Sequence, residues 1–361
     1  MNPPRIGVNR RDLLRLRRPT AEGTAGIESS AAPGSRYDLV RVHRPAMGSS
    51  FEVRLPANTP GAVDLSCRAL DLIDALEAQM TVYRDDSEVS RLNATAHLGP
   101  VEVEPGLFRL LQDAVALSRE TGGAYDVTSG ALSEAWGFVR GPKRVPEPDA
   151  LADARSQTGW HHLRLDPERR TVAFDRQGIR INLGSIGKGY AIDRVVELLR
   201  AYWWPTAGLV HGGRSSLFAL GSPPGRFAGR WEITLHNPFR PESPLGVFRL
   251  RNRALGTSGT AFQQFVVDGR AFGHIIDPRS GEPALGPASV TVLAPTAAAA
   301  DALSTAFYLL GANAAAAYVD AHPEIGAVIV ESGPADWPGP PRVLVFGLSE
   351  SDFVAEPGTL R

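Results

Sequence analysis

The sequence predicts an α+β fold in which mixed sheets carry flanking helices. Apolar residues alternate over 38–55, interrupted by one turn, which is the pattern of a β-hairpin, and a second hairpin pattern lies at 262–276. Apolar residues recur instead at helical spacing over 62–80, 105–121 and 296–311. Hairpins and amphipathic helices in one chain are typical of the α+β class.

The composition is that of a globular protein large enough for one big domain or two average ones. The chain has 361 residues, of which 43% are hydrophobic. Its net charge of -1 shows no excess of positive charge that would favour binding to nucleic acid or to an anionic membrane. No apolar run approaches the ~20 residues that span a bilayer. The single cysteine, Cys67, excludes an internal disulfide and a cysteine-rich metal site.

A basic segment precedes the predicted domain. Residues 9–15 resemble a twin-arginine export signal, but residues 16–23 lack the apolar core of about 7–15 residues that membrane engagement requires. We therefore expect residues 1–36 to form a disordered basic arm and the protein to be cytoplasmic. We expect one ordered domain over 37–348 and a C-terminal tail over 349–361.

The first predicted elements follow each other closely. Pro45–Gly48 forms the turn of the first hairpin, and Ala62–Met80 predicts a long amphipathic helix. The helix over 105–121 is stopped by the glycine pair 122–123. Between Gly141 and Asp149 the composition turns to Pro, Lys, Arg and Glu, which indicates a surface loop.

Residues 180–193 join a short strand pattern, three glycines and a predicted helix that begins near Tyr190. Glycines let the backbone approach a ligand closely, and a helix start stabilises an anion. Lys188 adds a full positive charge, in a chain whose only other lysine is Lys143. The glycine spacing excludes both a P-loop and a dinucleotide fingerprint. The segment is therefore either a phosphate-binding turn of another kind or a plain connection from strand to helix.

The second hairpin leads to a candidate catalytic histidine. Asp268 and Gly269 favour the type I′ turn of a two-residue hairpin, and His274 is expected on the return strand. The rigid turn that follows places the carboxylate of Asp277 three residues further on. A histidine in a strand is often structural. Beside a phosphate loop, general acid–base catalysis or phosphate contact is the alternative.

The helix from Thr296 to Gly311 is apolar nearly all round and is therefore expected to be buried. It carries Asp301 into the interior, where an unpaired charge is costly and a cation is needed. Thr305 lies one turn away on the same face, and the two oxygens suit magnesium or calcium rather than zinc. In the alternative, Asp301 pairs with an arginine and Thr305 bonds back to a carbonyl.

Taken together, these motifs resemble those of the FAD:protein FMN transferases of the ApbE type over about 47–348. The motifs occur in the family's order: Met47-Gly48, Met80-Thr-Val-Tyr83 with Ser87-Glu88, Tyr125-Asp-Val-Thr128, Gly187-Lys-Gly-Tyr190 with Asp193, Gly212-Gly213, Thr257-Ser-Gly259, His274-Ile-Ile-Asp-Pro278 and Ala300-Asp-Ala-Leu-Ser-Thr305. The resemblance implies two intimately packed lobes with an FAD cleft between them. It also implies magnesium-dependent transfer of FMN from FAD to a Thr or Ser of an acceptor protein, with release of AMP.

The resemblance also implies roles for single residues. The metal would be held by Asp301, Thr305 and the backbone carbonyl of Ser185, and Lys188 and His274 would join Asp301 in catalysis. His274 would assist deprotonation of the acceptor hydroxyl or steady the transferring phosphoryl group. The implied FAD contacts are Met47, Tyr83, Ala124, Tyr125, Asp126, Asn182, Lys188 and Ile275. Tyr83 would stack on an aromatic ring of FAD.

The chain departs from the family pattern at two positions and leaves two rival functions open. Asn182 and Arg214 stand where family members usually carry an acid, which puts FAD affinity in question. One rival is a magnesium-dependent FAD pyrophosphatase, since water and an acceptor hydroxyl attack the same phosphorus. The other is a non-catalytic flavin carrier. Neither the identity of the acceptor nor the oligomeric state follows from the sequence.

Overall fold

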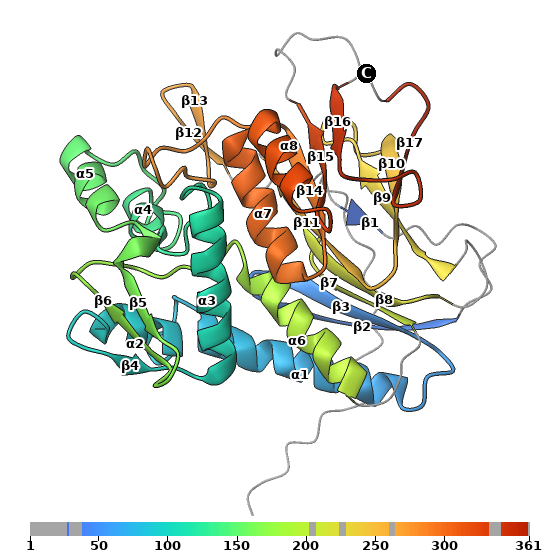
Figure 1. Ribbon diagram of the computed structural model, residues 1–361, viewed down its shortest axis with the longest axis horizontal. Helices are drawn as coiled ribbons and strands as arrows, with labels where there is room; N and C mark the ends of the chain where they lie inside the picture. The colour runs from blue at the N-terminus through green and yellow to red at the C-terminus, as the bar shows by residue number, and fades with distance from the viewer. Residues whose placement is uncertain are drawn as a thin grey trace, which may run out of the picture.

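The computed structural model describes residues 27–28, 38–201, 207–223, 229–259, 264–331 and 341–359. In this part of the chain an eight-stranded sheet has helices packed on one face and a four-stranded sheet on the other, and a smaller lobe lies beside the helices (Figure 1). The predicted α+β class is confirmed. Every pair of named strands that the structure gives is antiparallel, and the parallel pairing is limited to an isolated bridge between Ser129 and Arg180.

The large sheet has the strand order β16-β15-β14-β11-β8-β7-β3-β2. Its strands are β2 (Leu39–Ala46), β3 (Ser49–Pro56), β7 (Ala207–Gly212), β8 (Ser216–Gly221), β11 (Arg253–Gly259), β14 (Ser289–Ala294), β15 (Gly326–Val330) and β16 (Val343–Phe346). The interior strand β14 is buried along its whole length, because helices cover one face and the second sheet covers the other.

Three helices cover the inner face of the large sheet: α1 (Ala62–Met80), α6 (Gly187–Ala201) and α7 (Ala297–Leu310). They lie side by side, α1 against α6 and α6 against α7, between the smaller lobe and the sheets (Figure 1). Helix α8 (Ala312–Ala321) follows α7 directly and packs on β15. The predicted burial of α7 is confirmed, since Asp301 and most of its apolar residues are buried.

The second sheet has the order β1-β9-β10-β17. Its strands are β1 (Ile27–Glu28), β9 (Trp231–His236), β10 (Pro244–Leu250) and β17 (Phe353–Ala355). Its apolar residues, with Phe248 at 0% exposure, form a second core against the large sheet. The segment predicted as a C-terminal tail therefore supplies β17, because its short apolar run pairs with β10.

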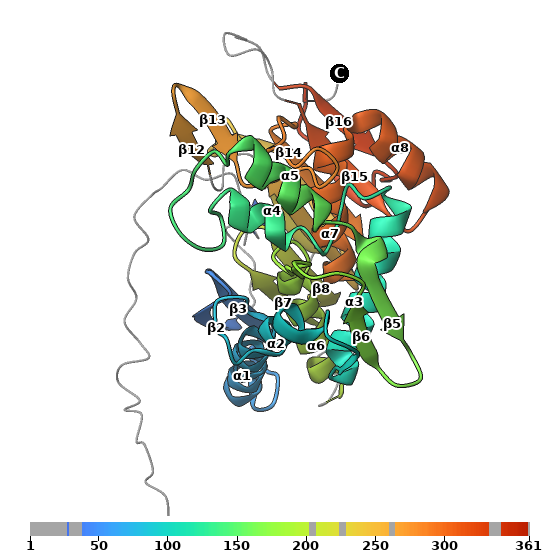
Figure 2. The ribbon, with the colours of Figure 1, turned by 90° about the vertical axis from the view of Figure 1, so that its left-hand side faces the viewer.

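The smaller lobe contains the helices between α1 and α6 (Figure 2). They are α2 (Glu88–Thr95), α3 (Pro105–Glu120), α4 (Gly130–Ala135), α5 (Pro148–Ser156) and the 3-10 helix η2 (Trp160–His162). A three-stranded sheet of order β4-β6-β5 completes it, with β4 (Val101–Glu102), β5 (Leu163–Asp166) and β6 (Thr171–Phe174). Helix α5 begins inside the predicted surface loop, because Pro148 is well suited to the first turn of a helix.

Both predicted hairpins are present. Strands β2 and β3 turn at Met47 and Gly48, whose φ values of 50° and 68° are those of a tight two-residue turn. Strands β12 (Gln264–Val267) and β13 (Arg270–Gly273) form the second hairpin, which projects above α4 in Figure 2. Its turn is type I′ as predicted, with φ of 49° at Asp268 and 76° at Gly269.

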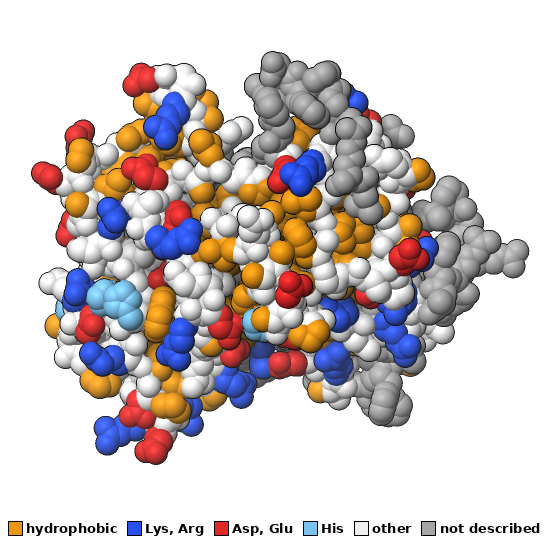
Figure 3. Space-filling model, turned by 45° about the horizontal axis from the view of Figure 1, so that its top comes forward, with side chains coloured by type: hydrophobic (Ala, Val, Ile, Leu, Met, Phe, Trp, Pro, Cys, Tyr) orange, Lys and Arg blue, Asp and Glu red, His pale blue; other side chains and the backbone are white. Residues whose placement is uncertain are grey.

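The predicted basic arm lies outside the described residues apart from β1, which pairs with β9. The prediction of a cytoplasmic location depends on that arm and stays a prediction. No helix in the described ranges is both long and apolar enough to cross a bilayer. On the face shown in Figure 3, basic and acidic side chains are interspersed, in agreement with a net charge of -1.

Candidate functional site

The site is built around Asp301, a buried carboxylate in the second turn of α7 that is only 5% exposed. The Gly189 N–H donates to its Oδ2 at 2.8 Å, and the Ser216 hydroxyl donates to its Oδ1 at 2.6 Å. Burial raises the pKa of Asp301, while the charge of Lys188 and the two hydrogen bonds act in the opposite direction. None of the contacts that the structure describes at Asp301 comes from an arginine, which was the alternative to a cation.

Gly189 reaches Asp301 because α6 and α7 pack almost backbone to backbone. A Cβ at Gly189 would lie 2.1 Å from the Ala297 carbonyl oxygen, so only glycine fits. One turn further along α6, the carboxylate of Asp193 accepts the N–H groups of Ala297 and Ala298 at 2.8 and 2.9 Å. Burial raises the pKa of Asp193 to about 7. Helix α6 therefore holds the N-terminus of α7 and fixes where Asp301 lies.

Hydroxyl groups gather on the same face of α7. The Thr305 hydroxyl donates to the Asp301 carbonyl at 3.3 Å, as the structural alternative for Thr305 predicted. The Ser258 hydroxyl lies 2.9 Å from that of Ser304 and 3.2 Å from that of Thr305. No group of three or more His, Cys, Asp or Glu side chains is placed for metal binding within the described ranges. One carboxylate with hydroxyl and carbonyl oxygens suits a hard cation such as magnesium better than zinc.

The backbone before α6 adds one more oxygen of this kind. In a regular helix the Gly189 N–H would donate to the carbonyl of Ser185, four residues earlier. The neighbouring Tyr190 N–H does follow that rule and donates to Ile186 at 2.9 Å. The Gly189 N–H instead donates to Asp301. This leaves the Ser185 carbonyl available to a cation at the start of α6.

Lys188 lies in the first turn of α6, half-buried, and its charge acts on Asp301. The helix begins at Gly187 rather than near Tyr190.

The strand predicted at 180–183 is wrong, because this segment is held by isolated contacts rather than by a ladder. Asn182 donates its backbone N–H to Val127 at 2.8 Å, and its side-chain oxygen accepts the Gly184 N–H at 2.9 Å.

The segment after α3 supplies three of the predicted FAD contacts. Ala124 and Tyr125 are each 1% exposed and Asp126 is 6% exposed. The carboxylate of Asp126 accepts the N–H and hydroxyl of Thr128 at 2.8 and 2.6 Å and the N–H of Trp160 at 2.9 Å. Burial raises the pKa of Asp126 against these hydrogen bonds. The Asp126 side chain is therefore fixed in place.

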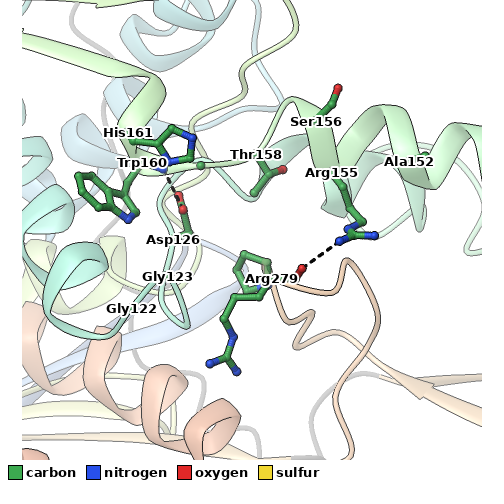
Figure 4. A pocket seen from close by; sticks show the side chains of 12 residues that line it. Gly122, Gly123, Asp126, Ala152, Arg155, Ser156, Thr158, Trp160, His161 and Arg279 are labelled. Atoms are coloured by element: carbon green, nitrogen blue, oxygen red, sulfur yellow. Dashed lines mark hydrogen bonds between the residues drawn. The ribbon is translucent and has the colours of Figure 1, made fainter.

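Asp126 lines a cavity of about 500 Å³ (Figure 4). The other polar lining residues carry no motif that predicts them in the sequence: Arg155, Ser156, Thr158, Trp160, His161 and Arg279. They come from three separate segments: the α5 end, η2 and the turn after His274. Arg155 donates to the Arg279 carbonyl at 3.2 Å, as the dashed line in Figure 4 marks. In the sequence, the local signal for this region is the glycine pair 122–123, which also lines the cavity.

His274 lies directly after β13 rather than on it, since that strand ends at Gly273. It is half-buried, and the next residue, Ile275, is 8% exposed. The nearby carboxylate of Asp277 is paired with Arg279, whose Nε and Nη2 donate to it at 2.9 and 2.8 Å. That ion pair holds the rigid turn that follows His274.

Met47 is half-buried and packs against the main core, whereas Tyr83 is exposed. Met47 occupies the tight turn between β2 and β3 and has φ of 50°. Tyr83 follows α1 and is 64% exposed, which is unusual for a large aromatic side chain and leaves its ring free to stack. Arg214 is also exposed. The contacts described for Met47 and Tyr83 do not join them to Asp301.

Comparison with known proteins identifies the family. The ApbE family model matches residues 47–329. The chain is 31% identical over 323 residues to the FAD:protein FMN transferase of Treponema pallidum, covering 85% of this chain and 87% of that protein. The ApbE protein of Thermotoga maritima superimposes with a TM-score of 0.75 at 28% identity, covering 82% of this chain and 96% of the other. The flavinyl transferase ApbE of Pseudomonas stutzeri gives 0.72 at 29% identity, covering 84% and 94%.

The family model covers the residues Asp301, Lys188 and His274, and the matches confirm the resemblance drawn from the motifs. The chain belongs to the ApbE family.

Proposed function

We propose that this enzyme transfers FMN from FAD to a Thr or Ser hydroxyl of an acceptor protein, with magnesium, and releases AMP. The relatives carry the name FAD:protein FMN transferase, and flavin transfer is the activity they share by name. One observation carries the proposal for this chain. The buried carboxylate of Asp301 meets the N-terminus of α6, with Lys188 beside it, so a cation site and an anion site coincide.

The residues present fit a magnesium ion. Asp301, Thr305 and the carbonyl of Ser185 would hold it, and the other Asp301 contacts come from Gly189 and Ser216. When bound, the ion supplies Lewis-acid stabilisation of the charge that develops on the phosphoryl oxygens.

The chain's own groups bind and orient FAD. Lys188 presents an ammonium group to the pyrophosphate, and the positive end of the α6 dipole adds to its field. The N–H groups of Gly187, Gly189 and Tyr190 already donate within the protein. Tyr83 offers an exposed ring to the flavin, and Asp126 lies in a cavity of about 500 Å³ that is large enough for part of a dinucleotide. Met47, Ala124, Tyr125, Asn182 and Ile275 complete the proposed FAD contacts.

We assign the transfer of the acceptor's proton to His274. The acceptor oxygen forms a bond to the phosphorus of the FMN half while the pyrophosphate P–O bond breaks and AMP leaves. His274 takes the proton of the attacking hydroxyl or holds the transferring phosphoryl group. Because it is half-buried, its ring can face both the protein interior and an incoming acceptor.

The experiment that tests this proposal is incubation with FAD, magnesium and a candidate acceptor protein, followed by in-gel detection of flavin fluorescence on the acceptor. Release of AMP is measured with and without the acceptor. FMN and AMP formed at the same rate without any labelled protein would favour the pyrophosphatase. No cleavage of FAD at all would favour the carrier, and either result would reject the proposal.

Lys188→Met is expected to raise the FAD KM or lower kcat by one to two orders of magnitude. Methionine keeps most of the stem but removes a charge-assisted hydrogen bond, which is worth ~1.5–3 kcal/mol. Lys143→Met is the matched control, because Lys143 is exposed in the loop before α5. Steady-state kinetics with FAD and magnesium measures both. Equal behaviour of the two variants would remove Lys188 from the phosphate site.

Tyr83→Ala is expected to weaken FAD binding roughly tenfold, since aromatic stacking is worth ~0.5–1.5 kcal/mol beyond burial and 1.4 kcal/mol is a factor of ten. Turnover at saturating FAD should survive, because the described hydrogen bonds of Asp301 come from Gly189 and Ser216 and not from Tyr83. Leu98→Ala, another exposed apolar residue at 78% exposure, is the control. Titration by flavin fluorescence decides the matter, and an unchanged Kd for Tyr83→Ala would contradict the stacking.

A further inference from the structure

The hairpin of β12 and β13 forms a small sheet that no other strand joins within the described ranges. One of its faces is anchored. Phe272 is 7% exposed, and its ring centroid lies 5.4 Å from those of Trp136 and Phe265. On the other face Val266 is 65% exposed. The hairpin therefore projects from the protein in Figure 2 while its packed face holds it in a fixed position.

Hairpin geometry determines which backbone groups of β13 point away from β12. In a two-residue hairpin the residues on either side of the turn exchange hydrogen bonds, and every second residue along each strand does the same. In β13 these residues are Arg270 and Phe272. The N–H and C=O groups of Ala271 and Gly273 therefore point outward. Among the described residues no hydrogen bond reaches these four groups, so this edge is open to a further strand.

Gly273 has no reason to be glycine in the described part of the protein. Its φ lies outside the left-handed range that favours glycine, and a Cβ at this position would meet no described atom within 4 Å. Glycine destabilises a strand relative to alanine, and in a strand it often marks a place where another backbone approaches closely. Ala271, the other residue on this edge, is also small and is exposed. The edge of β13 is therefore free of bulky side chains.

His274 connects this edge to the proposed reaction, because it follows Gly273 directly and is half-buried. An extended segment that pairs with Ala271 and Gly273 would run on to His274. Residues that face each other on paired strands have Cβ atoms about 4.5–5.5 Å apart. A Thr or Ser at that point of the segment would therefore come within reach of the His274 ring.

We propose that the acceptor protein binds as an extended segment that pairs with the outer edge of β13 and brings its Thr or Ser hydroxyl to His274. This inference rests on the proposed function and identifies the surface that receives the acceptor. Main-chain hydrogen bonds supply the binding, as in other cases of strand addition to a sheet edge. A second copy of this chain on the same edge would cover His274 and compete with the acceptor.

Ala271→Pro tests the edge, because proline removes one outward N–H and is tolerated where that N–H faces solvent. Val266→Pro is the matched control, since Val266 lies opposite Ala271 and its N–H points outward from β12. With an acceptor that the wild type labels with flavin, Ala271→Pro should lower kcat/KM for the acceptor about tenfold. Val266→Pro should leave it unchanged. Both variants should keep the Kd for FAD, measured by flavin fluorescence with magnesium chelated.

Hydrogen exchange of the wild type gives a second measurement, which decides the matter if Ala271→Pro does not fold. The amides of Ala271 and Gly273 should exchange quickly in the free protein and become protected by the same acceptor with its modified Thr or Ser replaced by alanine. The amides of Arg270 and Phe272, already bonded to β12, serve as the internal reference.

Three results would overturn the inference. They are equal acceptor kinetics of the two proline variants, unchanged exchange at Ala271 and Gly273, and protection of these amides that grows with enzyme concentration without acceptor. The last would show that a second copy occupies the edge. Failure of the proposed function is distinct from all three, because the wild type would then label no acceptor with flavin.

Discussion

Asp301→Asn should lower magnesium-dependent FAD cleavage by about 1,000-fold, because a metal that stabilises phosphoryl charge contributes several kcal/mol and each 1.36 kcal/mol is tenfold in rate. Asparagine has the shape of aspartate but no charge. Its oxygen can still accept the Gly189 N–H, and its amide can donate to the Ser216 hydroxyl, which rotates to accept. The loss would therefore report on the cation site and not on a collapsed fold.

Two comparisons make this result specific. Thr305→Ala should be milder, about tenfold, because a neutral hydroxyl contributes less to a cation than a carboxylate does. Asp320→Asn, an exposed aspartate on the neighbouring α8, should leave the rate unchanged. Thermal unfolding of each variant is measured beside the rate of AMP release. Wild-type turnover by Asp301→Asn with magnesium as the sole divalent cation would show that the metal assignment is wrong.

Gly189→Ala should destabilise the protein by about 3 kcal/mol or more, which is the cost of severe overpacking. In an ordinary helix interior the same change would stabilise by up to ~1 kcal/mol. The sign reverses here because the new Cβ would lie 2.1 Å from the Ala297 carbonyl oxygen and 2.6 Å from the Ala298 nitrogen. These are backbone atoms, so α6 and α7 would have to separate. The contact between Gly189 and Asp301 would be lost with them.

The expected observation is a thermal midpoint lowered by roughly 5 °C or more, together with loss of magnesium-dependent FAD cleavage. Gly99→Ala is the control, because a Cβ there meets nothing within 4 Å. Its midpoint should stay close to that of the wild type. If Gly189→Ala unfolded like Gly99→Ala, the close packing of α6 on α7 would not hold in the protein.

Local patterns in the sequence determined the elements that depend on neighbouring residues. The apolar spacing of Ala62–Met80 predicted α1 to the residue, and the Asp268-Gly269 pair predicted a type I′ turn. The apolar surround of Asp301 predicted its burial. In each case the cause lies within one helix or one hairpin, so spacing and turn chemistry are sufficient.

Tertiary structure decided the features that join distant segments. Asp301 receives its hydrogen bonds from Gly189 and Ser216, which are 112 and 85 residues away in the sequence. Residues 180–183 have an apolar strand pattern, yet they form no ladder because isolated contacts take up their backbone groups. Arg180 and Asn182 bond to the segment at 127–130, and both backbone groups of Ile181 bond to the Asn93 side chain. The cavity at Asp126 likewise joins the segment after α3 to the α5 end, η2 and the turn after His274.

The sequence by itself therefore determined the α+β class, the family, and the residue types of the candidate site. Only the tertiary structure decided that the Gly189 N–H donates to Asp301 and not to the Ser185 carbonyl, and that the Ser216 hydroxyl donates to the same carboxylate. The physical reason is that hydrogen-bond partners in a buried site are chosen by which backbones pack together. That choice depends on the close approach of α6 and α7, which no local spacing encodes.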